Sequence, residues 1–238
     1  MLIISFDAVG DSELDELMSY PTIASFAKEA AIVREVSTIF ASNTYPIHTS
    51  VVTGVKPAVH GICANIEPFP ALFPQWKSAE KGIRAKTLWQ AAKESGIDTA
   101  TVFWPVTAGA KTIRYNIPEV LARPGESQII TSLKAGSKYL QLKYFLKYRP
   151  TINRTNLQPG LDNFATACMA DIMRHERPGL CLIHLTAYDT MRHKYGKNST
   201  AIRVALETLD HNLSLLLEAA GDRPVILFSD HSQLEVHK

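Results

Sequence analysis

Acidic residues directly follow short apolar runs at both ends of this chain, and this pattern constrains its fold more than any other feature. Asp7 follows the run "LIISF" near the N-terminus, and Asp230 follows "VILFS" near the C-terminus. Asp189 follows a third run, "LCLIHLTAY". Runs of this kind, separated by helical patterns, indicate strands of a mostly parallel sheet. The three acidic residues therefore mark the carboxyl ends of strands.

Helical patterns separate these runs. The segment "YPTIASFAKEA" has helical spacing after a proline, and "AKTLWQAAKESG" predicts an amphipathic helix that ends at Gly96, before the strand "IDTATVFW". Two more helices are predicted at about residues 161–174 and 199–220, and "AIVREVSTI" (residues 31–39) has a strand-like composition. The alternation predicts the α/β class, with a mostly parallel central sheet and helices on both faces.

One domain, residues 1–238, accommodates this pattern. A chain of 238 residues with 46% hydrophobic residues is long enough for one large α/β domain with a substantial core. The segment at about 118–155, with its cluster of Lys, Tyr and Leu, breaks the alternation. We predict that it forms a small cap or insertion.

Charge and cysteine content narrow the classes of partner. A formal net charge of +2, with dispersed Lys and Arg, argues against a nucleic-acid groove or a polybasic membrane anchor, so we expect a small phosphorylated substrate, no nucleic-acid polymer and no membrane. Without a signal peptide we expect a cytoplasmic location, or secretion if a leader was removed. Cys63, Cys168 and Cys181 lack CxxC spacing and are predicted to be small buried hydrophobes.

The acidic strand ends predict a metal site. Because carboxyl ends of parallel strands share one edge of the sheet, Asp7, Asp189 and Asp230 are expected there together with His231. His193, four residues beyond Asp189, completes a set of Asp and His side chains that suits zinc or a similar divalent cation. Taken singly, such an Asp is more often a helix cap and such a His a structural or surface residue. The combination indicates the metal site.

Five motifs in this order resemble one known family. They are "IISFDAVG", "NTYPIHTSVVTGVKPAVHGICAN", "FWP", "YDTMRHKYG" and "FSDHSQ", and they run from near Leu2 to the last residues. The chain resembles the alkaline phosphatase superfamily, and within it the type I phosphodiesterase / nucleotide pyrophosphatase family. The resemblance implies an alkaline-phosphatase-like fold and a metal-dependent hydrolase of phosphodiester or pyrophosphate bonds in nucleotide-like substrates.

The resemblance also implies roles for individual residues. Thr44 matches the nucleophile that forms a phosphothreonine intermediate, because coordination to a cation favours the alkoxide of a hydroxyl that is otherwise a weak nucleophile. Asn65 matches the asparagine that donates to a phosphoryl oxygen. Tyr45 stands at the aromatic position that stacks on a nucleobase or other leaving group, with a packing role beside the site as the alternative.

Two divalent ions, zinc or else manganese, are implied as cofactors. By resemblance the first ion is held by Asp7, Thr44, Asp230 and His231. Asp189 and His193 hold the second ion.

The chain departs from the family pattern at several positions. The family often has Asn where Ile47 stands, Gly where Arg192 stands and "SDHGM" where this chain reads "SDHSQ". These positions lie beside the implied ligands, so they affect substrate preference more than reaction type. Arg192 is expected either to contact a substrate anion or to face solvent.

The second implied ion lacks a ligand that the family supplies. The family uses a histidine well downstream of the "SDH" motif, whereas this chain stops seven residues after His231. His237 is a poor substitute because "QLEVHK" reads as the start of a strand or turn. We expect the chain to be truncated at its C-terminus.

Other functions remain open at this stage. A sulfatase would need a Cys or Ser in a CxPxR or SxPxR setting, which "NTYPIH" does not offer. A phosphomonoesterase or phosphomutase of the same superfamily would use the same ions. The alternative that is not primarily an enzyme is a catalytically weak metal-binding module.

Overall fold

A single parallel sheet organises the chain. The computed structural model describes residues 1–67, 75–152 and 157–234. Within them five strands follow the order β3-β2-β4-β1-β5, and every pair is parallel. The strands are β1 (Leu2–Phe6), β2 (Thr99–Val102), β3 (Tyr115–Ile117), β4 (Leu180–Leu185) and β5 (Val225–Ser229). The predicted α/β fold with a mostly parallel sheet is confirmed.

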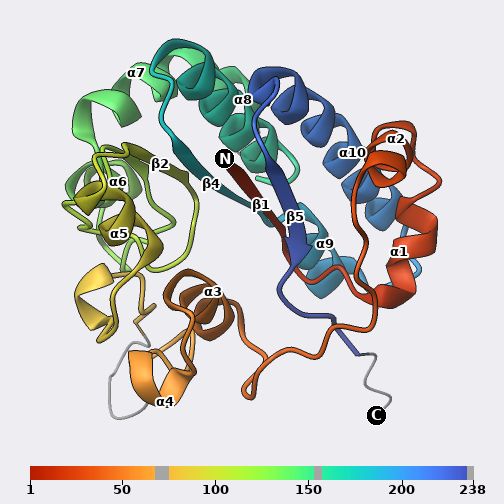
Figure 1. Cartoon of the computed structure of the whole chain (residues 1–238), viewed down its shortest axis with the longest axis horizontal. Helices are drawn as coiled ribbons and strands as arrows, with labels where there is room; N and C mark the ends of the chain where they lie inside the picture. The colour runs from red at the N-terminus through yellow and green to blue at the C-terminus, as the bar shows by residue number, and fades with distance from the viewer. Residues whose placement is uncertain (68–74, 153–156, 235–238) are drawn as a thin grey trace.

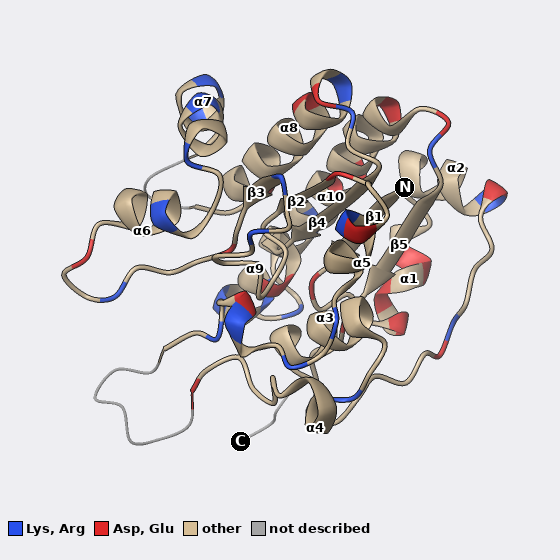
Figure 2. Ribbon diagram, turned by 60° about the vertical axis from the view of Figure 1, so that its left-hand side comes forward, with Lys and Arg blue, Asp and Glu red and all other residues tan. Residues whose placement is uncertain are grey.

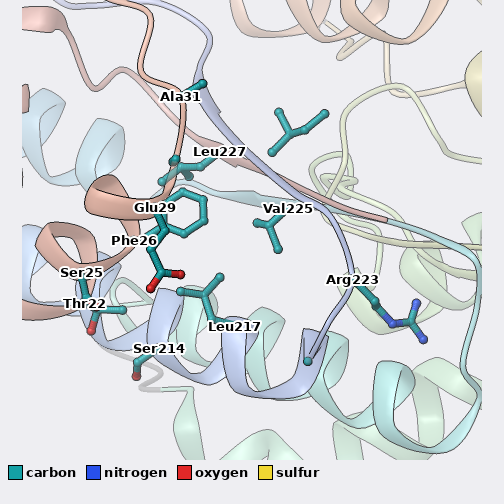
Figure 3. Close-up of a pocket in the computed structure, with 13 residues that line it drawn as sticks. Thr22, Ser25, Phe26, Glu29, Ala31, Ser214, Leu217, Arg223, Val225 and Leu227 are labelled. Carbon is teal, nitrogen blue, oxygen red and sulfur yellow. The ribbon is translucent and has the colours of Figure 1, made fainter.

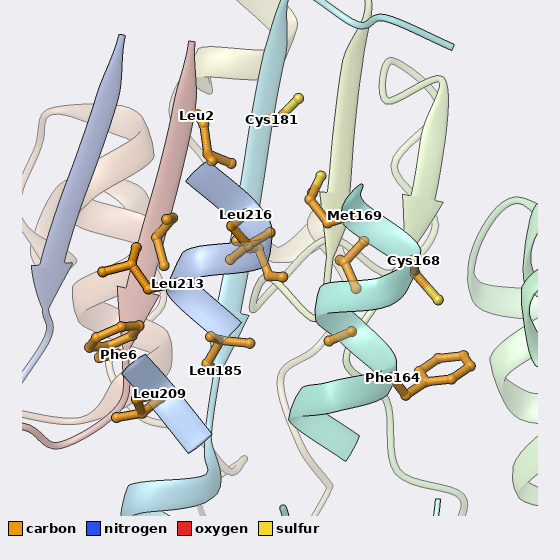
Figure 4. Packing of buried hydrophobic residues seen from close by; sticks show 14 of the residues in the cluster. Leu2, Phe6, Phe164, Cys168, Met169, Cys181, Leu185, Leu209, Leu213 and Leu216 are labelled. Atoms are coloured by element: carbon orange, nitrogen blue, oxygen red, sulfur yellow. The ribbon is translucent and has the colours of Figure 1, made fainter. Parts of the chain in front are cut away.

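Helices α8 (Gly160–His175) and α10 (Thr200–Ala220) cover one face of the sheet. Alternate β1 residues point to them, because side chains along a strand alternate between faces with a period of two. Leu2 and Phe6 thus pack in one cluster with Met169 of α8 and with Leu213 and Leu216 of α10 (Figure 4). This cluster is the larger part of the core.

Helices α3 (Thr44–Thr53) and α5 (Leu88–Glu94) contribute to the core on the opposite face. There Ile3 and Leu182 pack with Val52 of α3 and Trp89 of α5. Trp104, just beyond β2, belongs to the same cluster and is fully buried. Helices therefore cover both faces, as predicted.

Shorter elements surround this framework (Figure 1). They are α1 (Asp11–Leu17), α2 (Pro21–Glu29), α4 (Pro57–His60), α6 (Gln128–Ala135), α7 (Lys138–Tyr148) and α9 (Ala187–Tyr195), with 3-10 turns η1 (Glu80–Gly82) and η2 (Arg149–Thr151). Helix α3 lies below the arrowhead of β5 in Figure 1. It therefore lies on the side of the sheet where the parallel strands end.

Several local predictions differ from the structure. The two long helices agree with α8 and α10 to within about a residue. Residues 31–39 form no strand, and Val33 and Val36 are 78% and 73% exposed, because no neighbouring strand lies beside this segment to pair with it. Cys168 and Cys181 are buried as expected, but Cys63 is exposed, so the prediction for Cys63 is wrong.

The predicted cap segment contains helices α6 and α7. Helix α7 carries several lysines (Figure 2), and two of them reach acidic residues that follow or belong to α8. Lys147 Nζ lies 2.9 Å from Asp171 Oδ1, and Lys143 Nζ lies 4.0 Å from Glu176 Oε1. Tyr144, between them, is fully buried. This segment is therefore anchored to the main body of the fold, and its role as a cap stays a prediction.

The structure contains a cavity of about 820 Å³, and Figure 3 shows the residues that line it. It is bounded by α2, α10 and the outer edge of β5, with Phe26, Leu217 and Leu227 among its lining residues. None of the predicted metal ligands lines it. In the part of the chain that the structure describes, no helix is both long and apolar enough for a transmembrane span.

Asp162 fixes the turn from β4 into α9. Its carboxylate is completely buried and accepts the backbone N–H groups of Thr186 and Ala187 at 3.0 and 2.8 Å. Gln158 Nε2 donates to the same carboxylate at 3.0 Å. These bonds satisfy amide groups at the start of α9, which have no partner within the helix. The position of Asp189 in the first turn of α9 therefore depends on Asp162.

Asp162→Ala should lower the free energy of unfolding by about 3 kcal/mol, because it leaves two N–H groups without their acceptor. Urea unfolding followed by circular dichroism measures the change. The exposed Asp222 provides the matched control, and Asp222→Ala should stay within about 0.5 kcal/mol. An equal effect of both substitutions would contradict the assigned role of Asp162.

Candidate metal centre and active site

The register of the sheet brings Asp7 and Asp230 together. Phe6 of β1 pairs with Leu185 of β4 and with Ser229 of β5, so the next residues of all three strands leave the sheet at one level. Ala8 N donates to Asp230 Oδ1 at 3.1 Å. Ala8 adopts a left-handed conformation with φ of 62°, which is uncommon for a residue other than glycine. The backbone after β1 thus holds the carboxylate that follows β5.

Each buried carboxylate uses one oxygen for anchoring and keeps the other free. Asp7 Oδ2 lies 3.2 Å from Nε2 of His184, a buried residue of β4. Asp7 Oδ1 and Asp230 Oδ2 are buried without a hydrogen-bond partner in the described structure. Buried polar atoms are nearly always paired, so two neighbouring orphan oxygens indicate that something positively charged belongs between them.

His231 and Thr44 complete this group of atoms. His231 Nε2 lies 3.3 Å from Asp7 Oδ1 and 3.5 Å from Asp230 Oδ2. Thr44 Oγ1 lies 3.3 Å from the same nitrogen. Ligands that surround zinc tetrahedrally at about 2.1 Å lie about 3.4 Å from one another. The atoms therefore have the chemistry and the spacing of a first metal site, with the predicted residues Asp7, Thr44, Asp230 and His231.

Thr44 is the first residue of helix α3. Asn43 before it is extended, with φ of −114° and ψ of 148°, and Gly54 ends the helix in the left-handed conformation. Tyr45 N donates to Asn65 Oδ1 at 2.8 Å, which fixes the amide of Asn65 beside the start of the helix. The first N–H groups of a helix have no partner within it and favour anions. Thr44 and Asn65 thus lie together at a site suited to a phosphoryl group.

His48 ties α3 to β1. Its Nδ1 lies 2.8 Å from the carbonyl oxygen of Thr44, and its Nε2 lies 2.9 Å from Ser5 Oγ. Complete burial and the nearby positive charge of His184 lower the pKa of His48 to about 3, so the imidazole is neutral. A neutral ring with Nδ1–H donates to Thr44 and accepts from the Ser5 hydroxyl. His48 therefore fixes Thr44 relative to Asp7, two residues beyond Ser5.

Electrostatics couple the buried groups. Burial disfavours the charged form of Asp7 and raises its pKa, although the interaction with His184 acts in the opposite direction and lowers it. Burial also disfavours the charged form of His184, but the bond to Asp7 and the charges of Asp7 and Asp230 outweigh it and raise the pKa of His184 to about 9. Asp230 is buried too, yet the surrounding histidines lower its pKa. The site thus concentrates negative charge that histidines stabilise.

Asp189 and His193 form a second, more exposed pair one helical turn apart. His193 Nε2 lies 3.4 Å from Asp189 Oδ1, again the spacing of two ligands on one cation. Gln233 Nε2 donates to the same Asp189 oxygen. The side chain of His193 is 72% exposed. The pair fits a second cation with fewer protein ligands than the first site, among the residues that the structure describes. His237 lies outside them.

Tyr45 is a packing residue in this structure. It is 2% exposed and packs with Ile62 and Val106, and its ring centroid lies 5.4 Å from that of Trp76. Glu119 is a neighbour that raises the pKa of Tyr45, and burial raises the pKa of Glu119 itself to about 7. This arrangement matches the packing alternative, and stacking of Tyr45 on a leaving group stays a prediction.

Arg192 differs from both expectations. It neither faces solvent nor lies free for a substrate anion, because it is 7% exposed and its guanidinium binds Glu13 Oε1 at 3.2 Å and the hydroxyl of Tyr188 at 2.9 Å. Its Nη2 also donates to the carbonyl oxygen of Gln233 at 2.6 Å. Arg192 is buried and not exposed because it forms an ion pair with the buried carboxylate of Glu13. Ile47, another departure, is buried in α3.

Three residues near the site, His48, His184 and Glu119, have no role that the sequence alone predicts. His48 lies within the quoted threonine motif, but its partners Ser5 and Thr44 are brought together only by the fold. A polar residue inside the apolar run "LCLIHL" is the signal for His184. Glu119 follows β3, a strand of three residues that no sequence pattern predicted.

Comparisons with known proteins agree with the geometry. The sequence model of the family described as "Type I phosphodiesterase / nucleotide pyrophosphatase" matches residues 1–238. The human ectonucleotide pyrophosphatase/phosphodiesterase family member 1 is 24% identical over 228 residues, covering 89% of this chain and 21% of that protein. The chain thus spans about a fifth of the length of this curated relative.

Solved structures resemble the fold. An inactive variant of murine ectonucleotide pyrophosphatase / phosphodiesterase 5 in complex with AMP has a TM-score of 0.67 at 19% identity, covering 98% of this chain and 56% of that one. Phosphonoacetate hydrolase from Sinorhizobium meliloti 1021 in complex with phosphonoformate has a TM-score of 0.64 at 21% identity, with coverages of 97% and 55%. These likenesses establish an alkaline-phosphatase-like fold.

Zinc should stabilise the metal-free protein through the first site. Free zinc at about 100 times its dissociation constant adds about 2.7 kcal/mol, which for a domain of this size raises the melting temperature by about 5–10 °C. Differential scanning fluorimetry with and without zinc measures this shift. Asp230→Asn should lose most of it and Asp222→Ala should keep it. A full shift in the Asp230 variant would contradict the assigned ligand set.

Proposed function

The chain belongs to the type I phosphodiesterase / nucleotide pyrophosphatase family, and we propose that it hydrolyses phosphodiester or pyrophosphate bonds of nucleotide-like substrates. The proposal rests above all on one observation. Thr44 Oγ1 lies at the start of α3 and within 3.3 Å of His231 Nε2, next to the orphan oxygens of Asp7 and Asp230. A hydroxyl in this position suits a nucleophile that cations activate.

In the proposed reaction Thr44 Oγ1 attacks the phosphorus atom. The bond from phosphorus to the leaving-group oxygen breaks, the leaving group departs with the proton that the Thr44 hydroxyl loses, and the phosphoryl group is carried on Thr44 as phosphothreonine. Water then attacks this phosphorus, which frees the Thr44 hydroxyl and releases the phosphorylated product. Asn65 supports the same step, because its Oδ1 is already bound by Tyr45 N and its Nδ2 is left to donate to a phosphoryl oxygen.

Two divalent ions, zinc or manganese, would favour ionisation of the Thr44 hydroxyl and of the attacking water and would neutralise phosphoryl charge. Asp7, Thr44, Asp230 and His231 would hold the first ion, and Asp189 and His193 the second. The buried orphan oxygens support the first assignment, and the 3.4 Å separation of Asp189 Oδ1 and His193 Nε2 supports the second.

Nucleotide-like substrates are proposed from the relatives. The human relative is named as an ectonucleotide pyrophosphatase/phosphodiesterase, and the murine structure holds AMP. The exposed ring of Trp76, which packs against Tyr45, offers an aromatic surface near Thr44 for a base or another planar group. A phosphomonoesterase of the same superfamily remains the second reading, since the same ligand set serves both reactions.

Thr44→Ala should lower the hydrolysis of a chromogenic phosphodiester by about 10³-fold or more, because it removes the nucleophile. Thr44→Ser keeps a hydroxyl and should retain part of the rate. Steady-state rates on a diester and on the matching monoester measure the effect and separate the two readings. Activity of Thr44→Ala within about tenfold of the wild-type rate would exclude Thr44 as the nucleophile.

A chelator should abolish hydrolysis, and zinc or manganese should restore it. The reason is that neither the Thr44 hydroxyl nor water is a strong nucleophile at neutral pH without a cation. The measurement is the diester rate after dialysis against chelator and again after stepwise addition of metal. Undiminished turnover by protein that elemental analysis shows to be free of metal would overturn the mechanism.

A further inference from the structure

Two departures from the family pattern meet beside the second cation pair. Arg192 lies in α9 and Gln233 follows β5, so 41 positions separate them in the sequence. Arg192 Nη2 donates to the carbonyl oxygen of Gln233 at 2.6 Å. The side chain of Gln233 then donates from Nε2 to Asp189 Oδ1. The two residues thus form one connected path that ends on a predicted metal ligand.

Arg192 is fixed by a buried ion pair. It is 7% exposed, and Glu13 of α1, which binds its Nη1 at 3.2 Å, is 4% exposed. Gly10 N and Ser12 Oγ donate to the Glu13 carboxylate at 3.0 and 2.7 Å, and Lys197 Nζ lies 3.2 Å from it. Burial raises the pKa of Glu13, but these donors and charges outweigh it and lower the pKa overall. The ionised pair leaves the guanidinium little freedom.

The same path fixes the segment after β5. Only two residues lie between Asp230 and Gln233, so a bond to the backbone of Gln233 also limits movement of the His231 loop. Gln233 is partly buried, and no protein hydrogen bond to its amide other than that with Asp189 is found among the described residues. Asp189 is therefore the hydrogen-bond partner of the Gln233 side-chain amide.

We propose that Gln233, held in place by Arg192, is a positioning residue for the second cation, an inference that rests on the proposed function. By donating to Asp189 Oδ1, the amide of Gln233 orients that carboxylate toward His193 Nε2, 3.4 Å away. An oriented ligand binds a cation more tightly because less rotational freedom is lost on binding. Hydrogen bonds to metal ligands typically change metal affinity by about 10–100-fold.

The test is an isothermal titration calorimetry experiment in which zinc alone is added to the metal-free protein. The wild-type protein should show a tight and a weaker binding event. Gln233→Met replaces the amide by an apolar side chain of similar length and should weaken the second event by about tenfold or more. The first event should stay within about twofold. Gln233→Asn keeps a shorter donor and should recover part of the affinity.

Asn198 provides the matched control, since it is an exposed amide just beyond α9. Asn198→Met should leave both events unchanged. Arg192→Met should weaken the second event in the same direction as Gln233→Met, because it releases the backbone of Gln233. An unchanged second event in Arg192→Met would overturn the role of Arg192.

Rates at increasing zinc give a separate readout. For Gln233→Met the zinc concentration at half-maximal diester hydrolysis should rise by the same factor as the second dissociation constant, while the rate at saturating zinc stays within about twofold. Absence of a second event in the wild-type protein, or equal second affinities in wild type and Gln233→Met, would overturn the proposal. Loss of the proposed function would instead show as hydrolysis that does not depend on Thr44, whatever the zinc affinities.

Discussion

Two buried carboxylates at adjacent strand ends are the constraint around which the rest of the site is built. Asp7 and Asp230 are 5% and 4% exposed, and transfer of ionised carboxylates from water to such an environment is costly unless they are paired. The Ala8 amide donates to one oxygen of Asp230, His184 Nε2 lies beside one oxygen of Asp7, and the remaining oxygens both lie near His231 Nε2. The protein groups around the two carboxylates do not fully compensate their negative charge. The site is therefore suited to binding a cation.

The position of Thr44 depends on contacts that extend well beyond the metal ligands. Neutral His48 joins the carbonyl of Thr44 to Ser5 of β1, and Asn65 binds the amide of Tyr45. Tyr45 in turn packs into a small cluster and lies near Glu119, which follows β3. Thr44 is thus held from β1, from the loop after α4 and from the edge of the sheet. Such support on rigid elements suits the nucleophilic role proposed for Thr44, because a nucleophile must be aligned with phosphorus.

Residues that differ from the family pattern have structural roles that their chemistry alone would not suggest. Arg192 has the charge to bind a phosphate but is committed to Glu13 and Tyr188. Through Gln233 it connects α1, α9 and the segment after β5, so three separate parts of the chain converge next to Asp189. The residues proposed for the first cation are therefore those that the family resemblance implies, whereas Arg192 and Gln233, beside the residues proposed for the second cation, depart from the family pattern.

Sequence patterns were enough for the α/β class, the long helices α8 and α10, the strands that carry Asp7, Asp189 and Asp230 beyond their ends, and the family. These features are local: apolar periodicity and the polar residues that end it are properties of short segments. The same local reasoning gave wrong predictions for residues 31–39 and for Arg192, because contacts with distant residues determine whether a segment forms a strand and whether a side chain is buried. Only the tertiary structure decided that His48 and His184 enclose the site, that Tyr45 is buried, and that Arg192 meets Gln233. The physical reason is that burial and pairing of a polar side chain depend on partners far away in the sequence, such as Ser5 for His48 and Glu13 for Arg192. The periodicity of a short segment contains no information about such partners.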